Sequence, residues 1–138
     1  MDRTPSEIGE RAELAVAGAL RLAGKRVYLP FFAADSRVDL VFEDEAGFHR
    51  AQVKTSLLRE DVIWFRTCSF TNKVHRDYRG EVDVIAVYSP ELDQVFLIPV
   101  DEAPARGGHL RLTPTRNGQA KGVRWARDYL LAAPSDLN

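Results

Sequence analysis

The amino-acid sequence predicts an α+β fold, in which an N-terminal helix is followed by a β-meander and the strands form a mixed sheet with flanking helices. Three observations support this prediction: a long N-terminal segment with helical periodicity, several short segments rich in β-branched residues, and turn residues between most of them. Such an order of helix and strand segments is typical of α+β architectures.

The first expected element is a helix that begins near Pro5 and ends at Gly24. Thr4 and Glu7 have the spacing of a capping box, and proline is favoured at the first helical position. Glycine commonly ends a helix. The apolar residues that recur at helical spacing between these ends are Ile8, Ala12, Ala15, Val16, Ala19, Leu20 and Ala23.

Two β-prone segments, 38–42 and 50–55, flank the polar segment 43–47, and this pattern predicts a hairpin. If the turn closes over residues 45–46, Asp39 lies directly opposite Gln52. Side chains alternate between the faces of a strand, so Gln52 and Lys54 share the face of Asp39. The opposite face is apolar and consists of Val38, Leu40, Phe42, Ala51 and Val53.

The remaining elements follow from local composition. Val82–Tyr88 is nearly continuous in β-branched residues, which is typical of a strand buried on both faces. Trp64, Phe65 and Phe70 are expected in the core, and Gly107-Gly108 is expected to form a flexible turn. The other expected elements are strands at 27–32 (an edge strand, because of Pro30), 62–66, 95–98 and 109–112, a polar loop with a short helical piece at 67–80, a short helix at 100–105, and a terminal helix or helical turn at 123–131.

Length and composition limit the possible classes of protein. With 138 residues, the chain fits one domain, 1–138, with its own core. No apolar segment approaches the roughly 20 residues that span a bilayer, and the N-terminus resembles no signal peptide. The single cysteine, Cys68, excludes an internal disulfide, so we expect a cytoplasmic protein.

The net charge of −1 does not by itself indicate a nucleic-acid binder, but the distribution of charge does favour one. Basic residues gather in the middle of the chain, where they outnumber the acids. A polyanion responds to this local charge rather than to the sum. The basic residues of this region are Arg50, Lys54, Arg59, Arg66, Lys73, Arg76 and Arg79.

Four segments together resemble the PD-(D/E)XK nuclease superfamily. They are Ile8-Gly9-Glu10 in the first helix, Asp39-Leu40-Val41, Gln52-Val53-Lys54-Thr55, and the stretch 78–100. The resemblance is to the Gln-variant branch, which contains a group I intron homing endonuclease, and it implies a restriction-endonuclease-like core. Val38 stands where the motif has proline, and Gln52 stands where the superfamily has its second acid. Glutamine supplies a neutral oxygen, so we expect weaker metal binding than two carboxylates would give.

The resemblance also implies roles for individual residues. Glu10, Asp39, Gln52 and Lys54 would be catalytic. Asp39, the Gln52 side chain and the Val53 carbonyl would hold Mg²⁺, for which Mn²⁺ could substitute; Mg²⁺ prefers such oxygen ligands. Lys54 would orient the attacking water and stabilise the phosphate in the transition state. The residues expected to contact DNA are Arg37, Thr55, Arg59, Lys73, His75, Arg76 and Arg79.

The sequence therefore predicts a Mg²⁺-dependent endonuclease that hydrolyses phosphodiester bonds in double-stranded DNA. Cutting both strands requires two active sites, so we expect a homodimer or homotetramer. Three alternatives stay open. The chain could be a Holliday-junction-resolving nuclease or a catalytically inactive DNA-binding module on the same scaffold. In the third, Asp39 forms a purely structural ion pair with Lys54 or Arg37 on a sheet surface.

Overall fold

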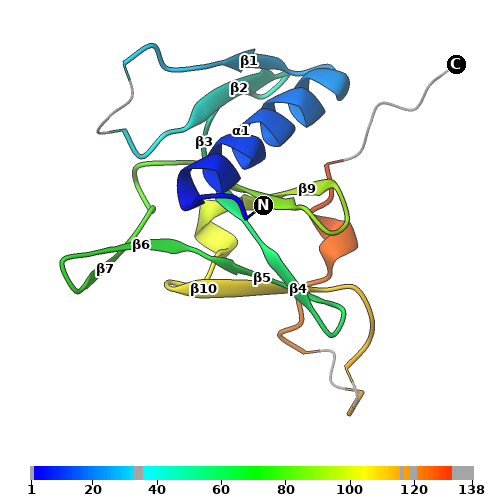
Figure 1. Ribbon diagram of the computed structural model, residues 1–138. Coiled ribbons are helices and arrows are strands. Elements are labelled where there is room, and N and C mark those ends of the chain that lie inside the picture. The colour runs from blue at the N-terminus through cyan, green and yellow to red at the C-terminus, as the bar shows by residue number, and fades with distance from the viewer. Residues whose placement is uncertain (1, 33–35, 116, 119–120, 132–138) are drawn as a thin grey trace, which may run out of the picture.

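The protein is described by a computed structural model, which covers residues 2–32, 36–115, 117–118 and 121–131. Figure 1 shows a helix, α1, lying across one side of a mixed sheet, with a second, smaller sheet on the other side. The predicted fold class, α+β with a mixed sheet, is confirmed. In the described part of the chain, no helix is long and apolar enough to cross a membrane.

Helix α1 spans Pro5–Leu22 and begins as the sequence predicts. The Thr4 side chain accepts a hydrogen bond from the Glu7 backbone N–H, and the Glu7 carboxylate accepts one from the Thr4 backbone N–H. The chain leaves the helix through Gly24, whose φ of +84° is a conformation that glycine adopts without steric cost. The buried residues of the helix are Ala12, Val16 and Leu20.

The larger of the sheets, called the large sheet here, has five strands within the described residues, in the order β1-β2-β3-β8-β9. Strands β3 and β8 are parallel, and the other neighbours are antiparallel, which makes the sheet mixed. Strand β8, which lies between β3 and β9, is buried at Ile85, Ala86 and Val87, as expected for a strand covered on both faces. The bounds are β1 Arg26–Tyr28, β2 Leu40–Asp44, β3 Gly47–Thr55, β8 Val84–Ser89 and β9 Gln94–Pro99.

The β2–β3 hairpin has the predicted register, from Leu40 opposite Ala51 to Asp44 opposite Gly47. The ladder is irregular just before β2. The Asp39 N–H donates to the Ala51 carbonyl at 2.8 Å, so two consecutive residues, Asp39 and Leu40, oppose one residue on β3. This is the arrangement of a β-bulge, which redirects side chains at its position.

The bulge changes the faces that simple alternation predicts. Leu40 packs under α1, whereas Val38 packs against the apolar cluster on the opposite side of the large sheet. The expectation that Val38 shares the apolar face of Leu40 is therefore wrong. Asp39 also does not form a regular ladder pair with Gln52: its backbone bonds to Ala51 and its side chain bonds to Val53.

The small sheet has the order β10-β5-β4 and covers the side of the large sheet away from α1 (Figure 1). Its strands are β4 Leu57–Arg59, β5 Val62–Arg66 and β10 Gly107–Arg111. Gly107 and Gly108 belong to β10, so the expected flexible turn is wrong. A Cβ on Gly108 would lie 2.6 Å from the Phe65 ring, and the glycine is what lets the two strands pair with this ring between them.

A hairpin of β6 Cys68–Thr71 and β7 Val74–Asp77 replaces the predicted polar loop with a helical piece. Its turn residues Asn72 and Lys73 have φ values of 52° and 64°, the pattern of a type I′ turn. Two short 3₁₀ turns, Val100–Glu102 and Ala126–Asp128, occupy the segments where a short helix and a terminal helix or helical turn were expected.

Two apolar clusters hold these layers together. The first lies between α1 and the large sheet and includes Val16, Leu20, Leu40 and Ala86. The second lies between the large and small sheets; its buried members are Ile63, Phe65, Tyr78, Val82, Ile85, Val87, Phe96, Ile98, Val100, Ala103, Leu110 and Ala126. Successive residues of β8 contribute to alternate clusters, so the large sheet is buried on both faces around its centre.

Candidate active site

Asp39 lies at the bulge, half-buried, where its carboxylate accepts a hydrogen bond of 2.8 Å from the Val53 N–H. Burial raises the pKa of Asp39 above its ordinary value, and the Val53 N–H and the charge of Lys54 offset only part of that rise. No cationic side chain of the described residues forms an ion pair with Asp39. The structural alternative, an Asp39 pair with Lys54 or Arg37, is therefore not formed.

Gln52 and Val53 are neighbours on β3, and Val53 is the residue that donates to this carboxylate. The Gln52 side chain is half-buried, and its Nε2 makes a long hydrogen bond of 3.4 Å to the Val53 carbonyl. A rotation of the amide by half a turn would exchange its oxygen and nitrogen, because both have the same shape. The Gln52 amide and the Val53 carbonyl thus lie together on β3, and the N–H of the same Val53 bonds to the Asp39 carboxylate.

Lys54 is fixed by a single buried side chain. Its Nζ donates to the Tyr78 hydroxyl oxygen at 2.8 Å and lies 4.8 Å from the centroid of the same ring. Only 3% of Tyr78 is exposed, so this ring cannot move without disturbing the core between the sheets. Tyr78 therefore restrains the ammonium group of Lys54 in one position near Asp39.

Arg37 contacts the same ring, because its guanidinium lies 3.8 Å from the Tyr78 centroid. Arg37 and Arg76 both donate to the carboxylate of Glu81. Arg37 also donates to the Ser69 hydroxyl and to the Arg76 carbonyl, at 2.9 Å each. These two predicted DNA-binding arginines thus already have an anionic partner in the described structure.

The other predicted DNA-binding residues are spread over a wider area. Arg79 donates to the Asp77 carboxylate and to the Ala103 carbonyl. Lys73 is at the tip of the β6–β7 hairpin, and His75 lies 4.6 Å from the Phe70 ring on the same hairpin. Thr55 ends β3 and Arg59 ends β4. These residues do not converge on one point, and their contact with DNA stays a prediction.

Helix α1 brings a glutamate to the site that the sequence interpretation did not include. Glu10 is exposed, whereas Glu13 is half-buried. The pKa of Glu13 is raised by burial first, then by the negative charges of Asp39 and Glu10. Glu13 is therefore the residue of α1 within electrostatic reach of Asp39. A signal was present in the sequence, because Glu13 has helical spacing with Val16 and Leu20 on the buried stripe.

The donor atoms at this site suit a hard divalent cation. The Asp39 carboxylate, the nearby Glu13 carboxylate and the neutral oxygens of Gln52 and Val53 are the oxygen ligands that Mg²⁺ and Mn²⁺ prefer. Mg²⁺ commonly needs only one or two protein carboxylates, because it retains several waters. No group of three or more His, Cys, Asp or Glu residues suited to a metal occurs in the described ranges. The residues thus fit Mg²⁺ and do not fit a zinc site closed by protein ligands.

A helix across a mixed sheet, with an acid, a glutamine and a lysine on the β2–β3 hairpin, is the arrangement of a restriction-endonuclease-like nuclease. The family model described as PD-(D/E)XK endonuclease matches residues 4–132. The chain therefore belongs to the PD-(D/E)XK endonuclease family. The predicted family is confirmed, and it supports the expectation that the protein is a nuclease.

The fold is similar to that of a bacterial homing endonuclease, I-Ssp6803I. The two chains are 23% identical; the similarity covers 94% of this chain and 88% of the other, with a TM-score of 0.65. At this level of identity the similarity is evidence for the fold. A search of curated proteins finds no match.

Proposed function

We propose that this protein is a Mg²⁺-dependent endonuclease that hydrolyses phosphodiester bonds in double-stranded DNA, as a homing-type enzyme would. One observation carries the proposal. The half-buried carboxylate of Asp39 has no ion-pair partner among the described residues, yet a lysine held by a buried tyrosine stands nearby. A carboxylate kept in this state costs stability, and a bound cation would remove that cost.

The residues divide the work of hydrolysis among them. Asp39 and Glu13, with the oxygens of Gln52 and Val53, would hold the metal, and Mn²⁺ would substitute for Mg²⁺. The metal would supply a more acidic bound water and positive charge beside the phosphate. Lys54 would orient the attacking water and stabilise the charge that develops on the phosphate oxygens. Tyr78 would keep the Lys54 ammonium group in position, because a misplaced charge stabilises the transition state poorly.

Cleavage of both strands requires two copies of this site. The chain offers one copy, so we propose that the active form is a homodimer or homotetramer in which two sites face opposite strands. The family and the similarity to a homing endonuclease support DNA as the substrate. Measurement of the molar mass with and without duplex DNA by light scattering would test the assembly. A monomer in both conditions would contradict it.

The function is tested by incubating the protein with plasmid and with branched DNA, in Mg²⁺ and in Mn²⁺. We expect linear product from the plasmid, and a loss of at least about 10²-fold in rate for Lys54→Ala, because a charge-stabilising group is removed. Lys25→Ala, just beyond the C-terminal end of α1, is the matched control. Product only from branched DNA would indicate a junction-resolving nuclease. DNA binding without product in either metal would contradict the enzyme and indicate a binding module.

A further inference from the structure

The outward face of the small sheet carries an unusual set of side chains. The strand registers align Leu57, Trp64 and His109 in one row across β4, β5 and β10. Arg59 on β4 pairs with Val62, in the next row toward the β4–β5 turn. Arg66 on β5 pairs with Gly107, which has no side chain that could cover the arginine. We call these five residues, Leu57, Arg59, Trp64, Arg66 and His109, the outer face.

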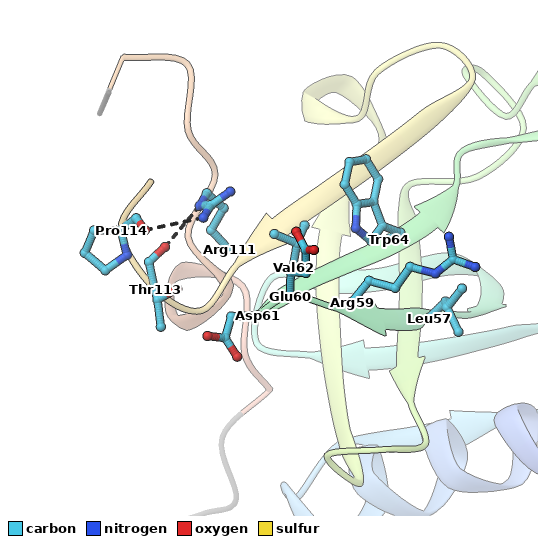
Figure 2. Close-up of a pocket in the computed structure, with 9 residues that line it drawn as sticks. All are labelled: Leu57, Arg59, Glu60, Asp61, Val62, Trp64, Arg111, Thr113 and Pro114. Carbon is cyan, nitrogen blue, oxygen red and sulfur yellow. Dashed lines mark hydrogen bonds between the residues drawn. The ribbon is translucent and has the colours of Figure 1, made fainter. Parts of the chain in front are cut away.

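The aromatic part of the outer face is exposed to solvent. Trp64 is 47% exposed and Leu57 is 46% exposed, and the Trp64 and His109 rings lie 5.1 Å apart. The prediction that Trp64 belongs to the core is therefore wrong, although its neighbour Phe65 is buried. Figure 2 shows the Trp64 indole standing away from the strands, with Arg59 and Leu57 on the adjacent strand. A large exposed indole beside cations is a surface suited to a ligand with flat rings and negative charge.

The arginines of the outer face are available, unlike those near Tyr78. The guanidinium groups of Arg59 and Arg66 have no hydrogen bond or ion pair to the described residues, whereas Arg37 and Arg76 share Glu81 and Arg79 contacts Asp77. An arginine that is already paired must break that contact before it binds a phosphate. An unpaired exposed arginine does not, so Arg59 and Arg66 bind a polyanion at lower cost.

The outer face is continuous with the candidate active site. A hollow of about 380 Å³ is lined by Lys54 and Thr55 at one end and by Trp64 and Arg66 at the other. Its lining contains two cations and no carboxylate. A second hollow, of about 1240 Å³, extends from Trp64 and Arg59 toward Arg111 and the β4–β5 turn. The Arg111 guanidinium there donates to the Thr113 and Pro114 carbonyls, as Figure 2 shows.

We infer that the outer face is the surface on which the DNA backbone next to the cut strand docks, with Arg66 and Arg59 on phosphates and Trp64 packed against a sugar or base. This inference rests on the proposed function. The acids Glu60 and Asp61, at the β4–β5 turn, would repel a phosphate and so mark the outer end of the contact. Arg66 lies toward Lys54, where the scissile phosphate would be, and Arg59 lies nearer the turn.

The test is DNA binding without metal, which is independent of cleavage. A labelled duplex of mixed sequence is titrated in EDTA by fluorescence anisotropy at several salt concentrations. For Arg59→Gln/Arg66→Gln we expect affinity to fall by about tenfold or more and the salt slope to fall by about 2. For Trp64→Ala we expect a loss of at least about fivefold with little change in slope, because an uncharged contact is removed.

The matched control is Arg26→Gln, an exposed arginine on the edge strand β1 of the large sheet, far from the small sheet in Figure 1. We expect unchanged affinity and slope for this variant. Equal binding by the wild type and the Arg59→Gln/Arg66→Gln variant would overturn the inference. A change in oligomeric state without a change in DNA affinity would also overturn it, because the outer face would then be covered by a second copy of the chain.

The outcomes separate this inference from the proposed function. If the wild type cleaves DNA and the variants of the outer face bind and cleave as it does, the inference fails and the nuclease stands. If binding depends on the outer face but no metal gives product, the inference stands and the nuclease fails. Circular dichroism and thermal unfolding of each variant check that these exposed substitutions leave the fold intact.

Discussion

Two charged regions near Tyr78, one around Glu81 and one around Asp39, differ in whether the carboxylate has a cationic partner. Glu81 accepts hydrogen bonds from both Arg37 and Arg76, so its negative charge is compensated. Asp39 is more buried than an ordinary surface acid, yet within the described part of the chain its carboxylate accepts a hydrogen bond only from a backbone N–H, that of Val53. Burial without a cation raises the pKa of Asp39. This comparison supports the proposal that Glu81 stabilises the structure and that Asp39 binds a cation.

The largest expected effect is that of Asp39→Asn on cleavage. The substitution keeps an oxygen that can accept the Val53 N–H but removes the charge that would hold a cation. We expect the cleavage rate to fall by at least about 10²-fold. In EDTA the same variant should be more stable than the wild type, because a buried unpaired charge is gone. Cleavage by this variant at the wild-type rate would contradict the proposal that the Asp39 carboxylate holds a cation.

The second effect concerns the stabilising region. Glu81→Gln removes the negative charge and one of the two acceptor oxygens, so Arg37 and Arg76 lose their anionic partner near a buried ring. We expect the free energy of unfolding to fall by about 1–2 kcal/mol, a value reduced for the partial exposure of Glu81. Urea unfolding measures it. Arg26→Gln, which removes an exposed charge elsewhere, serves as the control and should change stability little.

The third effect tests the link between the two regions. Tyr78→Phe keeps the buried ring but removes the hydroxyl that accepts from Lys54. We expect kcat to fall about tenfold with KM within about twofold, because one hydrogen bond to a charged group corresponds to roughly this factor. A purely structural role for the hydroxyl would instead lower stability and leave kcat unchanged. Steady-state cleavage kinetics together with thermal unfolding distinguish the two.

The smallest effects lie in the pH dependence of stability without metal. The Arg50 guanidinium holds the pKa of Asp83 below its ordinary 3.8. The stability that ionised Asp83 contributes is therefore present above pH 3.8 and is lost as the pH falls through the lower pKa of the folded state. Asp39 has a pKa above its ordinary 3.8. The stability that protonated Asp39 contributes is therefore present below pH 3.8 and is lost as the pH rises through the higher pKa of the folded state.

Unfolding of Asp83→Asn and Asp39→Asn between about pH 3 and 7, in EDTA, checks both signs. We expect Asp83→Asn to be less stable than the wild type at neutral pH by under about 1 kcal/mol, since this pair is largely exposed. The difference should vanish in acid. The stability of Asp39→Asn relative to the wild type should increase as the pH rises above 3.8. Parallel stability curves for all three proteins would mean that neither carboxylate changes its pKa on folding.

The fold was predictable where local signals were strong. The start of α1 follows from the capping box at Thr4, and the β2–β3 register follows from the turn between Asp44 and Gly47. The β6–β7 hairpin was missed because its turn uses Asn72 and Lys73 instead of the usual Asn-Gly, so the segment had the composition of a loop. Gly107 and Gly108 were misassigned because the Phe65 ring beside them becomes visible only when the strands are paired.

The candidate site was predictable in part, and the reasons are physical. Asp39, Gln52 and Lys54 lie on adjacent strands, so local pairing brings them near one another. The bulge depends on which carbonyl accepts the Asp39 N–H, and no local pattern determines that choice. Tyr78 lies 24 residues after Lys54, so only the tertiary fold joins them. Glu10 was the residue of α1 that the family resemblance pointed to, whereas the charge on the apolar stripe of the helix is that of Glu13.

The parallel pairing of β3 with β8 has a consequence for the order of events during synthesis. Ala51–Thr55 pairs with Val84–Tyr88, and the small sheet strands β4 and β5 and the β6–β7 hairpin lie between them in the chain. A ribosome-bound chain that ends before β8 can form α1 and the first hairpin, but it lacks the long-range closure that fixes Lys54. If the proposed function holds, a nascent chain without β8 would therefore lack a fixed Lys54 and would not cleave DNA.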